Sequence, residues 1–233
     1  MEIETERIYQ PPLPDLGSAL SMVGDLPGFL HRSIDEKVGL AERACYDRYL
    51  RILNALELRS AFGSSLLDLG CANGFFAYLL TIHLCSRATA VEDTRGSTAG
   101  YGKSAFLEPL REAQRQYGLE QLEIVEQPIE TFLASQPERR WDVVLCLSVL
   151  HHLYTGYGDR PEVGRMEAGE RRRLFEAIGR ATSSVLYLEF DHGRVPDDFL
   201  DDFASAGGFA HCQTLGSSSS AVGDLRNIYE LTK

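Results

Sequence analysis

Apolar residues follow two alternating patterns along the chain after residue 64. Short apolar runs predict strands, and segments in which apolar residues recur every three or four positions predict helices. The expected strands are 65–70, 88–93, 122–127, 142–149, 183–190, 209–216 and 225–233. The expected helices are 74–84, 103–118, 130–135, 167–181 and 195–207.

This alternation predicts an α/β fold: a doubly wound, mostly parallel, seven-stranded sheet with helices on both faces. The runs 142–149 and 183–190 lack polar alternation, which is typical of strands that are covered on both faces. The last two strands follow each other without a helix, and the polar residues 217–224 lie between them. We therefore expect these two strands to form a C-terminal antiparallel hairpin.

The first part of the chain has a different pattern. Residues 10–17, QPPLPDLG, are rich in proline and cannot form a helix or a central strand. A helix is expected from Ser33, because Ser33 and Glu36 fit a capping box and apolar residues then recur at helical spacing. We expect an N-terminal helical cap over residues 1–60 and a second unit over residues 61–233.

Composition and charge restrict the functions to consider. The 233 residues carry a formal net charge of −11, which argues against broad contact with nucleic acid or with anionic membranes. No apolar run is long enough to span a membrane, and residues 1–30 lack the pattern of a secretory signal. The five cysteines form no CxxC pair, which is typical of reduced thiols rather than of a zinc site or disulfides. We expect a cytoplasmic protein that needs no metal.

The segment SLLDLGCANGFFAYLL places one acid and a run of small residues between the first strand and the helix after it. In an open α/β sheet, ligands bind beyond the carboxyl ends of the strands. Gly70 and Gly74 allow a tight turn and a close approach of the backbone, and Cys71 and Ala72 are also small. The N–H groups that begin the helix suit a carboxylate, and Asp68 suits an ammonium group. An amino-acid moiety has both groups.

The turn after the first expected strand does not match a dinucleotide-binding motif. The G-x-G-x-x-G pattern needs glycine where this chain has Ala72 and Phe75. However, Glu92 ends the second expected strand, at the place where an acid commonly binds ribose hydroxyls, and Asp93 is an alternative for this role. An amino acid joined to a ribose indicates S-adenosylmethionine as the cofactor.

At these residues the chain resembles the class I S-adenosylmethionine-dependent methyltransferases. The resemblance is carried by LLDLGCANG, by the acid in AVEDT, by WDVVLCLSVLHHL and by the terminal LGSSSSAVGDLRNIYEL. It extends from about Ser64 to Lys233. The first of these motifs together with VLCLSVLHHL is fairly specific, whereas either one alone would be weak.

The resemblance implies a set of cofactor contacts. The methionine part would lie on Asp68, Gly70, Cys71, Ala72, Asn73 and Gly74. Glu92 would hold the ribose, and Leu147 and Ser148 would line the side of the sulfonium and the amine. The family often has an acid that meets adenine where this chain has Pro128, so the adenine contact passes to the Ile129 amide or to Glu130.

The front helix carries two arginines on its polar face, Arg43 and Arg48. Such residues are commonly surface charges. The resemblance, in contrast, implies that an N-terminal helix can close over the cofactor pocket.

Two histidines, His151 and His152, follow the fourth expected strand at its carboxyl end. Adjacent side chains point in different directions, so we expect only one to face the pocket, and His151 is the stronger candidate. Glu189, Asp191 or His192 would approach it from the next strand, and a carboxylate beside an imidazole fixes its tautomer. The hypothesis is that His151 is a general base and that Glu189 orients it or contacts substrate. A structural role for both histidines and a metal held by this group are the alternatives.

The predicted function is the methylation of a hydroxyl or amine on a small molecule, such as a natural product. Residues 1–60 and the expected loop 154–168 would shape the acceptor pocket. Methylation of RNA, either tRNA or a 5′-phosphate, is the alternative, because LCLSVLHHLYTGYGD loosely resembles a segment of RNA-capping methyltransferases. A non-catalytic, methyltransferase-like binding subunit is a third interpretation. The oligomeric state is left open, with a homodimer among the options.

Overall fold

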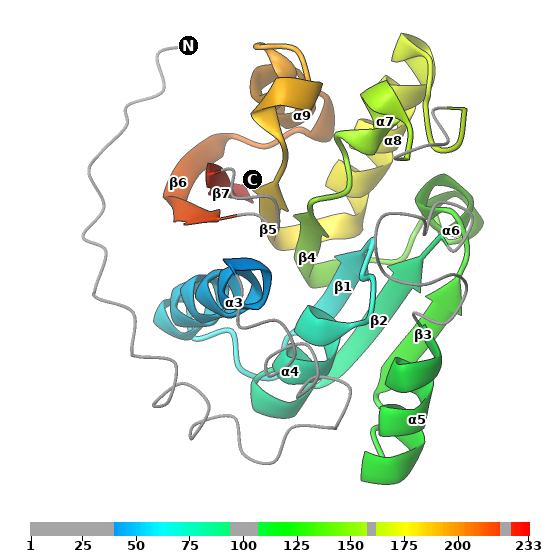
Figure 1. The fold of residues 1–233 in the computed structure, drawn as a ribbon, viewed down its shortest axis with the longest axis vertical. Coiled ribbons are helices and arrows are strands. Elements are labelled where there is room, and N and C mark those ends of the chain that lie inside the picture. Colours follow the sequence, from blue (N-terminus) through cyan, green and yellow to red (C-terminus); the bar gives the residue numbers. More distant parts are fainter. Residues whose placement is uncertain (1–39, 94–106, 158–161, 220–224) are drawn as a thin grey trace.

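The computed structural model describes residues 40–93, 107–157, 162–219 and 225–233. Seven strands form one sheet in the order β3-β2-β1-β4-β5-β7-β6 (Figure 1). They are β1 (Ser65–Leu69), β2 (Arg87–Glu92), β3 (Leu122–Glu126), β4 (Trp141–Leu147), β5 (Thr182–Glu189), β6 (His211–Ser219) and β7 (Leu225–Thr232). Strands β1 to β5 pair in parallel, and β7 lies antiparallel between β5 and β6. The predicted fold class, a doubly wound, mostly parallel sheet with a C-terminal antiparallel hairpin, is confirmed.

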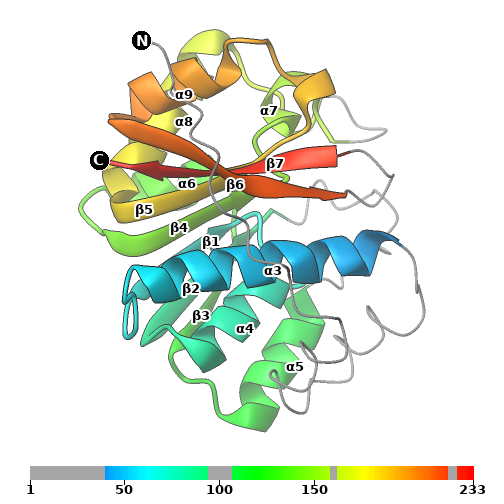
Figure 2. The same ribbon diagram turned by 90° about the vertical axis from the view of Figure 1, so that its left-hand side faces the viewer.

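Helices cover both faces of this sheet (Figure 2). One face carries α3 (Leu40–Leu58), α4 (Phe75–His83) and α5 (Leu107–Tyr117). The other face carries α6 (Ile129–Ser135), α8 (Ala168–Ala181) and α9 (Phe199–Gly207). Two short helices, α7 (His152–Thr155) and η2 (His192–Arg194), follow β4 and β5. A separate hydrophobic core fills each of the two layers.

Successive residues of each central strand enter the two cores in turn. In β1, Leu66 packs in the core beneath α3 and α4, whereas Leu67 packs in the core beneath α6 and α8. The same alternation places Asp68, Glu92 and Glu189 on the face of α3 and α4, at or near the carboxyl ends of their strands. Because both faces of the central strands are buried, their sequences lack polar alternation. Because Asp68, Glu92 and Glu189 lie on the same face near the ends of parallel strands, they lie at the same edge of the sheet.

A buried carboxylate, Glu230 of β7, ties the end of α3 to the sheet. Arg59, which directly follows α3, donates to both of its oxygens. The Tyr187 hydroxyl donates to it at 3.0 Å, and the Gln213 amide donates at 2.6 Å. These donors compensate the burial of the charge, and α3 is held against the edge formed by β6 and β7 (Figure 2).

Several expected boundaries are shifted. Strand β6 continues through Ser219, so Ser217–Ser219, which the sequence predicts in a loop, pair with β7. Residues 152–155 are helical, which shortens the expected loop 154–168 at its start. The capping box at Ser33 and most of the predicted cap 1–60 lie outside the described residues, and α3 is observed from Leu40.

Candidate functional site

The turn after β1 is built by its glycines. Gly70 and Gly74 have φ angles of 73° and 77°, and Ala72, between them, has a φ of 51°. The N–H groups of Gly70 and Cys71 both donate to the carbonyl of Val91 in β2, at 2.9 and 3.1 Å. A Cβ on Gly70 would approach Cγ2 of Val149 to 2.6 Å, so a glycine is required where the turn passes the end of β4. The predicted tight turn at the carboxyl edge of the sheet is therefore present.

Asp68 lies just before this turn and is only 2% exposed. Its Oδ2 atom is buried and has no hydrogen-bond partner among the described residues. Burial, reinforced by the charge of Glu92 and opposed by the backbone N–H of Ala77, raises the pKa of Asp68 to about 7. A buried oxygen without a donor is unusual in a folded protein, and it suits a ligand that brings a donor.

Glu92, at the end of β2, reaches across to the same turn. Its Oε2 accepts a hydrogen bond of 2.6 Å from the N–H of Ala72. Burial raises the pKa of Glu92 to about 7, and the nearby charge of Asp93 acts in the same direction. Glu92 therefore borders the turn directly, whereas the alternative acid, Asp93, is a buried residue that lies beside it.

The other residues of the turn are small or packed. The thiol of Cys71 is buried, which raises its pKa well above the usual range and makes the side chain a poor nucleophile. Asn73 Oδ1 accepts a bond of 3.3 Å from the N–H of Phe75 at the start of α4. The Phe75 ring packs edge-on against Tyr49 and Phe76 in the core.

Ser148, directly after β4, has an unusual backbone conformation, with a φ of 58°. Its hydroxyl donates to Glu189 Oε2, and its own N–H donates to the Glu189 carbonyl at 2.9 Å. Leu147, the last residue of β4, is buried and pairs with Glu189. The residues predicted to line the sulfonium side are thus fixed to the end of β5.

Two arginines converge on this serine and this glutamate, and we call the group the arginine cluster. Its members are Arg48 of α3, Ser148, Glu189, Asp191 and Arg226 of β7. Arg48 Nη1 lies 3.0 Å from Glu189 Oε2, and Arg226 Nη1 lies 3.5 Å from Glu189 Oε1. Both guanidiniums also donate to Ser148 Oγ at 3.2 Å, and Arg226 reaches Asp191 at 3.4 Å. Glu189 is 1% exposed and each arginine side chain 12%, so these are buried charges.

This cluster changes two sequence-based interpretations. Arg48 is not a surface charge, because it lies against the carboxyl edge and over the Phe76 ring. Arg226 was missed, since a single arginine near the start of a strand carries no local signal. Its position becomes meaningful only because β7 pairs with β5, which puts Ile228 opposite Glu189.

His151 is 3% exposed, and its Nδ1 atom has no hydrogen-bond partner among the described residues. Burial, followed by the charges of His152, Arg226 and Arg194, lowers the pKa of His151 to about 2. Within the described part of the chain, the hydrogen bonds of Glu189 go to the arginines and Ser148, and none goes to His151. The predicted orienting contact is therefore wrong: the arginines hold the carboxylate.

The neighbouring histidine has its own partners. His152 Nδ1 donates to the carbonyl of Gly156 at 2.9 Å, and its ring stacks on Tyr157 at 4.3 Å. Burial lowers the pKa of His152 as well. As expected, the two adjacent histidines differ in environment, and only His151 has a ring nitrogen that is buried without a partner.

The two residues predicted to contact adenine, Ile129 and Glu130, lie at the start of α6. Ile129 is the first residue of this helix, so its N–H is one of the groups that have no partner within the helix. Its side chain is buried in the core beneath α6 and α8, and the side chain of Glu130 is exposed. A ligand at this point would meet the backbone of Ile129 rather than its side chain.

The described residues contain neither a metal-binding cluster nor a membrane-spanning helix. No group of three or more His, Cys, Asp or Glu side chains is placed to hold a metal ion in this part of the chain. Within the same residues, no helix is both long and apolar enough to cross a membrane.

No protein-family model matches the sequence, and no curated protein matches it. Solved structures are similar in fold. The magnesium protoporphyrin IX methyltransferase ChlM from Synechocystis PCC 6803, with bound SAM, aligns with a TM-score of 0.61 at 16% identity, covering 95% of this chain and 98% of its own. The bifunctional kinase-methyltransferase WbdD aligns with a TM-score of 0.64 at 19% identity, covering 94% of this chain but only 46% of its own.

A third similar structure is PH1948 from Pyrococcus horikoshii, a proposed RNA methyltransferase. It aligns with a TM-score of 0.55 at 16% identity and covers 81% of this chain and 85% of its own. The chain thus spans less than half the length of WbdD and most of the length of the two smaller proteins. With its strand order and these similarities, the chain has the fold of the class I S-adenosylmethionine-dependent methyltransferases.

Proposed function

We propose that the chain is an S-adenosylmethionine-dependent methyltransferase that acts on a hydroxyl or amine of a small molecule. The observation that carries this proposal is the buried Oδ2 of Asp68, which has no partner among the described residues. A protonated amine would supply the missing hydrogen bond. At the start of α4 the N–H groups of Phe75 and Ala77 already donate to Asn73 and Asp68, so a ligand carboxylate would meet the N–H of Phe76, and Glu92 suits ribose hydroxyls. An amino acid joined to a ribose therefore fits these three groups together.

The remaining cofactor contacts follow from positions around the carboxyl edge. The residues proposed to hold S-adenosylmethionine are Asp68, Gly70, Cys71, Ala72, Asn73, Gly74, Glu92, Ile129, Glu130, Leu147 and Ser148. When bound, this cofactor supplies a methyl group that its sulfonium already activates. The work left to the chain is mainly to hold the acceptor in line, and such orientation can remove about 7–11 kcal/mol of the barrier.

The acceptor is proposed to meet His151. A pKa of about 2 keeps this imidazole neutral at working pH, so its unpartnered Nδ1 can donate to or accept from the acceptor group. The same low pKa makes it a weak base, so we assign most of its effect to placing the acceptor rather than to removing its proton. Glu189 would act through Ser148 as a positioning residue. His152 would be a second positioning residue, through its hydrogen bond to the Gly156 carbonyl.

A small acceptor is favoured over RNA by the charge of the chain. A net charge of −11 opposes the approach of a polyanion. ChlM, which matches over nearly the full length of both chains, is named for a small-molecule acceptor. RNA remains the second candidate, because PH1948 has a similar fold.

Calorimetric titration with S-adenosylmethionine and S-adenosylhomocysteine tests the cofactor. We expect Asp68→Asn to weaken both at least about tenfold, because the ammonium loses a charged partner. Asp201→Asn, at an exposed position of α9, is the matched control and should leave affinity unchanged. Equal affinity of Asp68→Asn and the unmodified chain would rule out the proposed amine site.

Methyl transfer is then measured with a panel of small hydroxyl and amine acceptors and with RNA. His151→Ala should lower turnover while leaving cofactor affinity nearly unchanged. Turnover that does not respond to His151→Ala would exclude His151 from acceptor placement. Cofactor binding without transfer to any acceptor would favour the non-catalytic binding subunit, and salt-dependent binding of RNA would favour the second candidate.

A further inference from the structure

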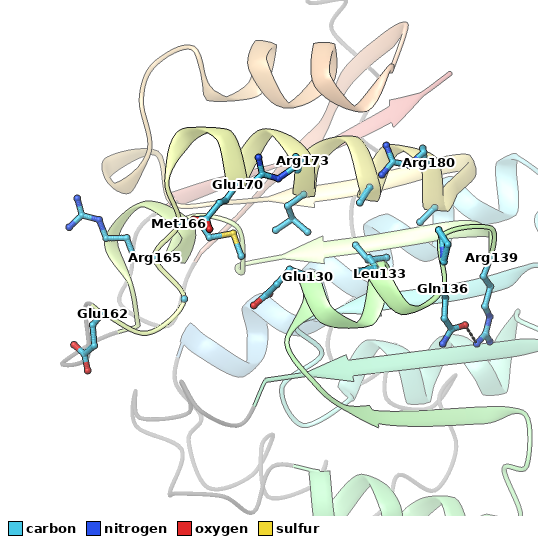
Figure 3. A pocket seen from close by; sticks show the side chains of 16 residues that line it. Glu130, Leu133, Gln136, Arg139, Glu162, Arg165, Met166, Glu170, Arg173 and Arg180 are labelled. Carbon is cyan, nitrogen blue, oxygen red and sulfur yellow. Dashed lines mark hydrogen bonds between the residues drawn. The ribbon is translucent and has the colours of Figure 1, made fainter.

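A cavity of 580 Å³ lies between α6 and α8 (Figure 3). Both helices cover the sheet face opposite to that of Asp68 and Glu189, so the cavity is separate from the arginine cluster. Its volume is within the range of small-molecule sites, about 300–1,000 Å³. Among the residues that line it, Glu130 is the one that is also a proposed cofactor contact.

The floor of the cavity is apolar. Leu133 of α6 and Leu174 of α8 line it and are buried in the core beneath these helices. Ala177 and Ala181 continue the same wall along α8, and Met166 lies at the end where α8 begins (Figure 3). These side chains would surround the hydrocarbon or aromatic part of a ligand.

The charged side chains around this floor are unevenly distributed. Glu130, Glu162 and Glu170 lie near the Met166 end, whereas Arg180 and Arg139 lie at the opposite end (Figure 3). Among the described residues that line the cavity, no carboxylate lies at that second end. The cavity is therefore amphipathic along its length, with the carboxylates that line it gathered at one end.

Three of the lining arginines, Arg165, Arg173 and Arg180, are exposed and form no ion pair with another described residue. Arg139 is occupied, since it pairs with Glu123 at 2.8 Å and lies over the Trp141 ring. Arg173 and Arg180 form no ion pair within the described part of the chain, and their spacing of seven residues puts both on the same side of α8. In contrast, Arg172 points elsewhere and pairs with Glu176 at 3.4 Å.

We propose that this cavity binds a small organic anion with an apolar body, whose carboxylate or sulfonate is held by Arg180, while Arg173 adds positive charge on the same side of α8. The apolar part lies on Leu133, Leu174 and Ala177. This inference does not depend on the proposed methyl transfer, because Arg173, Arg180 and the apolar residues that it uses are not proposed cofactor contacts.

Two dyes of the same apolar body test the proposal: 8-anilinonaphthalene-1-sulfonate, which is anionic, and N-phenyl-1-naphthylamine, which lacks the sulfonate. We expect the sulfonate dye to bind the folded chain at one saturable site, more tightly than the neutral dye. The double change Arg173→Gln and Arg180→Gln should weaken the sulfonate dye about tenfold and leave the neutral dye unchanged. Arg172→Gln is the matched control on the same helix and should have no effect.

A second variant fills the space without touching charge. Ala134 is exposed on α6 and lines the cavity, so Ala134→Trp should block both dyes while near-ultraviolet circular dichroism stays native. The proposal is overturned if neither dye binds, if the neutral dye binds as tightly as the sulfonate, or if Arg172→Gln weakens binding as much as the double change. Displacement of the dye by S-adenosylhomocysteine would place it at the other face and would also overturn it. Arg180 also stabilises the C-terminal end of the α8 dipole, so Arg180→Gln can lower stability by itself. A loss of stability in the double variant is therefore not evidence for ligand binding.

Discussion

The ionisation of Asp68 gives a quantitative test of the proposed cofactor site. Burial raises the pKa of this carboxyl from 3.8 to about 7, and the charge of Glu92 contributes to the shift. A protonated amine binds the charged carboxylate, so ligand binding should select deprotonated Asp68 and release protons. The affinity for an amine-bearing ligand should therefore fall when the pH is lowered through 7.

The size of this effect follows from the pKa. Asp68 is charged in about half of the molecules at pH 7.0 and in about 3% at pH 5.5. The affinity of S-adenosylhomocysteine should fall about fifteenfold between these pH values, or about 1.6 kcal/mol. The α-amino group of the ligand, with a pKa of about 8, stays mainly protonated over this range. A carboxyl with an ordinary pKa would change the affinity by only a few per cent.

The assay is isothermal titration of S-adenosylhomocysteine at pH 5.5, 6.0, 6.5 and 7.0, in two buffers of different ionisation enthalpy. The two buffers give the number of protons released on binding. Glu92→Gln should shift the midpoint of the pH dependence downwards, because the two carboxyls titrate as a pair. An affinity that is constant from pH 5.5 to 7.0, with the fold intact by circular dichroism, would refute a buried carboxylate at the amine site.

Three further predictions concern stability. Because the pKa of Asp68 is raised in the fold, keeping this carboxyl charged at pH 8 costs the folded state up to about 4 kcal/mol relative to the unfolded chain. Asp68→Asn removes this cost and should raise the Tm of the unliganded chain. A lower Tm would contradict this prediction. A Cβ on Gly179 of α8 would overlap the carbonyl of Gly207 in α9, so Gly179→Ala should lower the free energy of unfolding in urea by about 1–3 kcal/mol. Gly169→Ala should not, because its added Cβ would lie 3.6 Å from the nearest atom, Arg173 Nη1. Glu189→Gln removes the buried carboxylate that Arg48 and Arg226 both contact and should lower the same free energy by about 3–5 kcal/mol; a change below about 1 kcal/mol would mean that the cluster is solvated.

Most of the fold could be predicted because its signals are local. Apolar runs of five to eight residues bounded by small or polar residues identify the strands, and the Gly70–Gly74 turn follows from residues that tolerate positive φ angles. The position of Asp68 and Glu92 follows from the same pattern, since both end neighbouring strands on one face. Boundaries were less well predicted: β6 extends through Ser219 because its serines can pair with β7 in a register that composition does not reveal.

The contacts across the site could not be predicted, because they depend on pairing between distant segments. Glu189 was expected beside His151, but Arg48 from α3 and Arg226 from β7 both reach it. These two ion pairs form only because α3 lies over the sheet and because β7 pairs with β5. The α6–α8 cavity has the same origin, since Leu133 and Arg180 are far apart in the sequence and meet only when the two helices pack side by side.

The central claim is that the Gly70–Gly74 turn and the two acids beside it receive an amino acid joined to a ribose. A crystal structure of the chain with S-adenosylhomocysteine tests it most directly. The account predicts the ligand ammonium within hydrogen-bond distance of Asp68 Oδ2 and a ribose hydroxyl on Glu92. A ligand bound elsewhere, with Asp68 Oδ2 still without a donor and Glu92 still bonded only to Ala72, would contradict it.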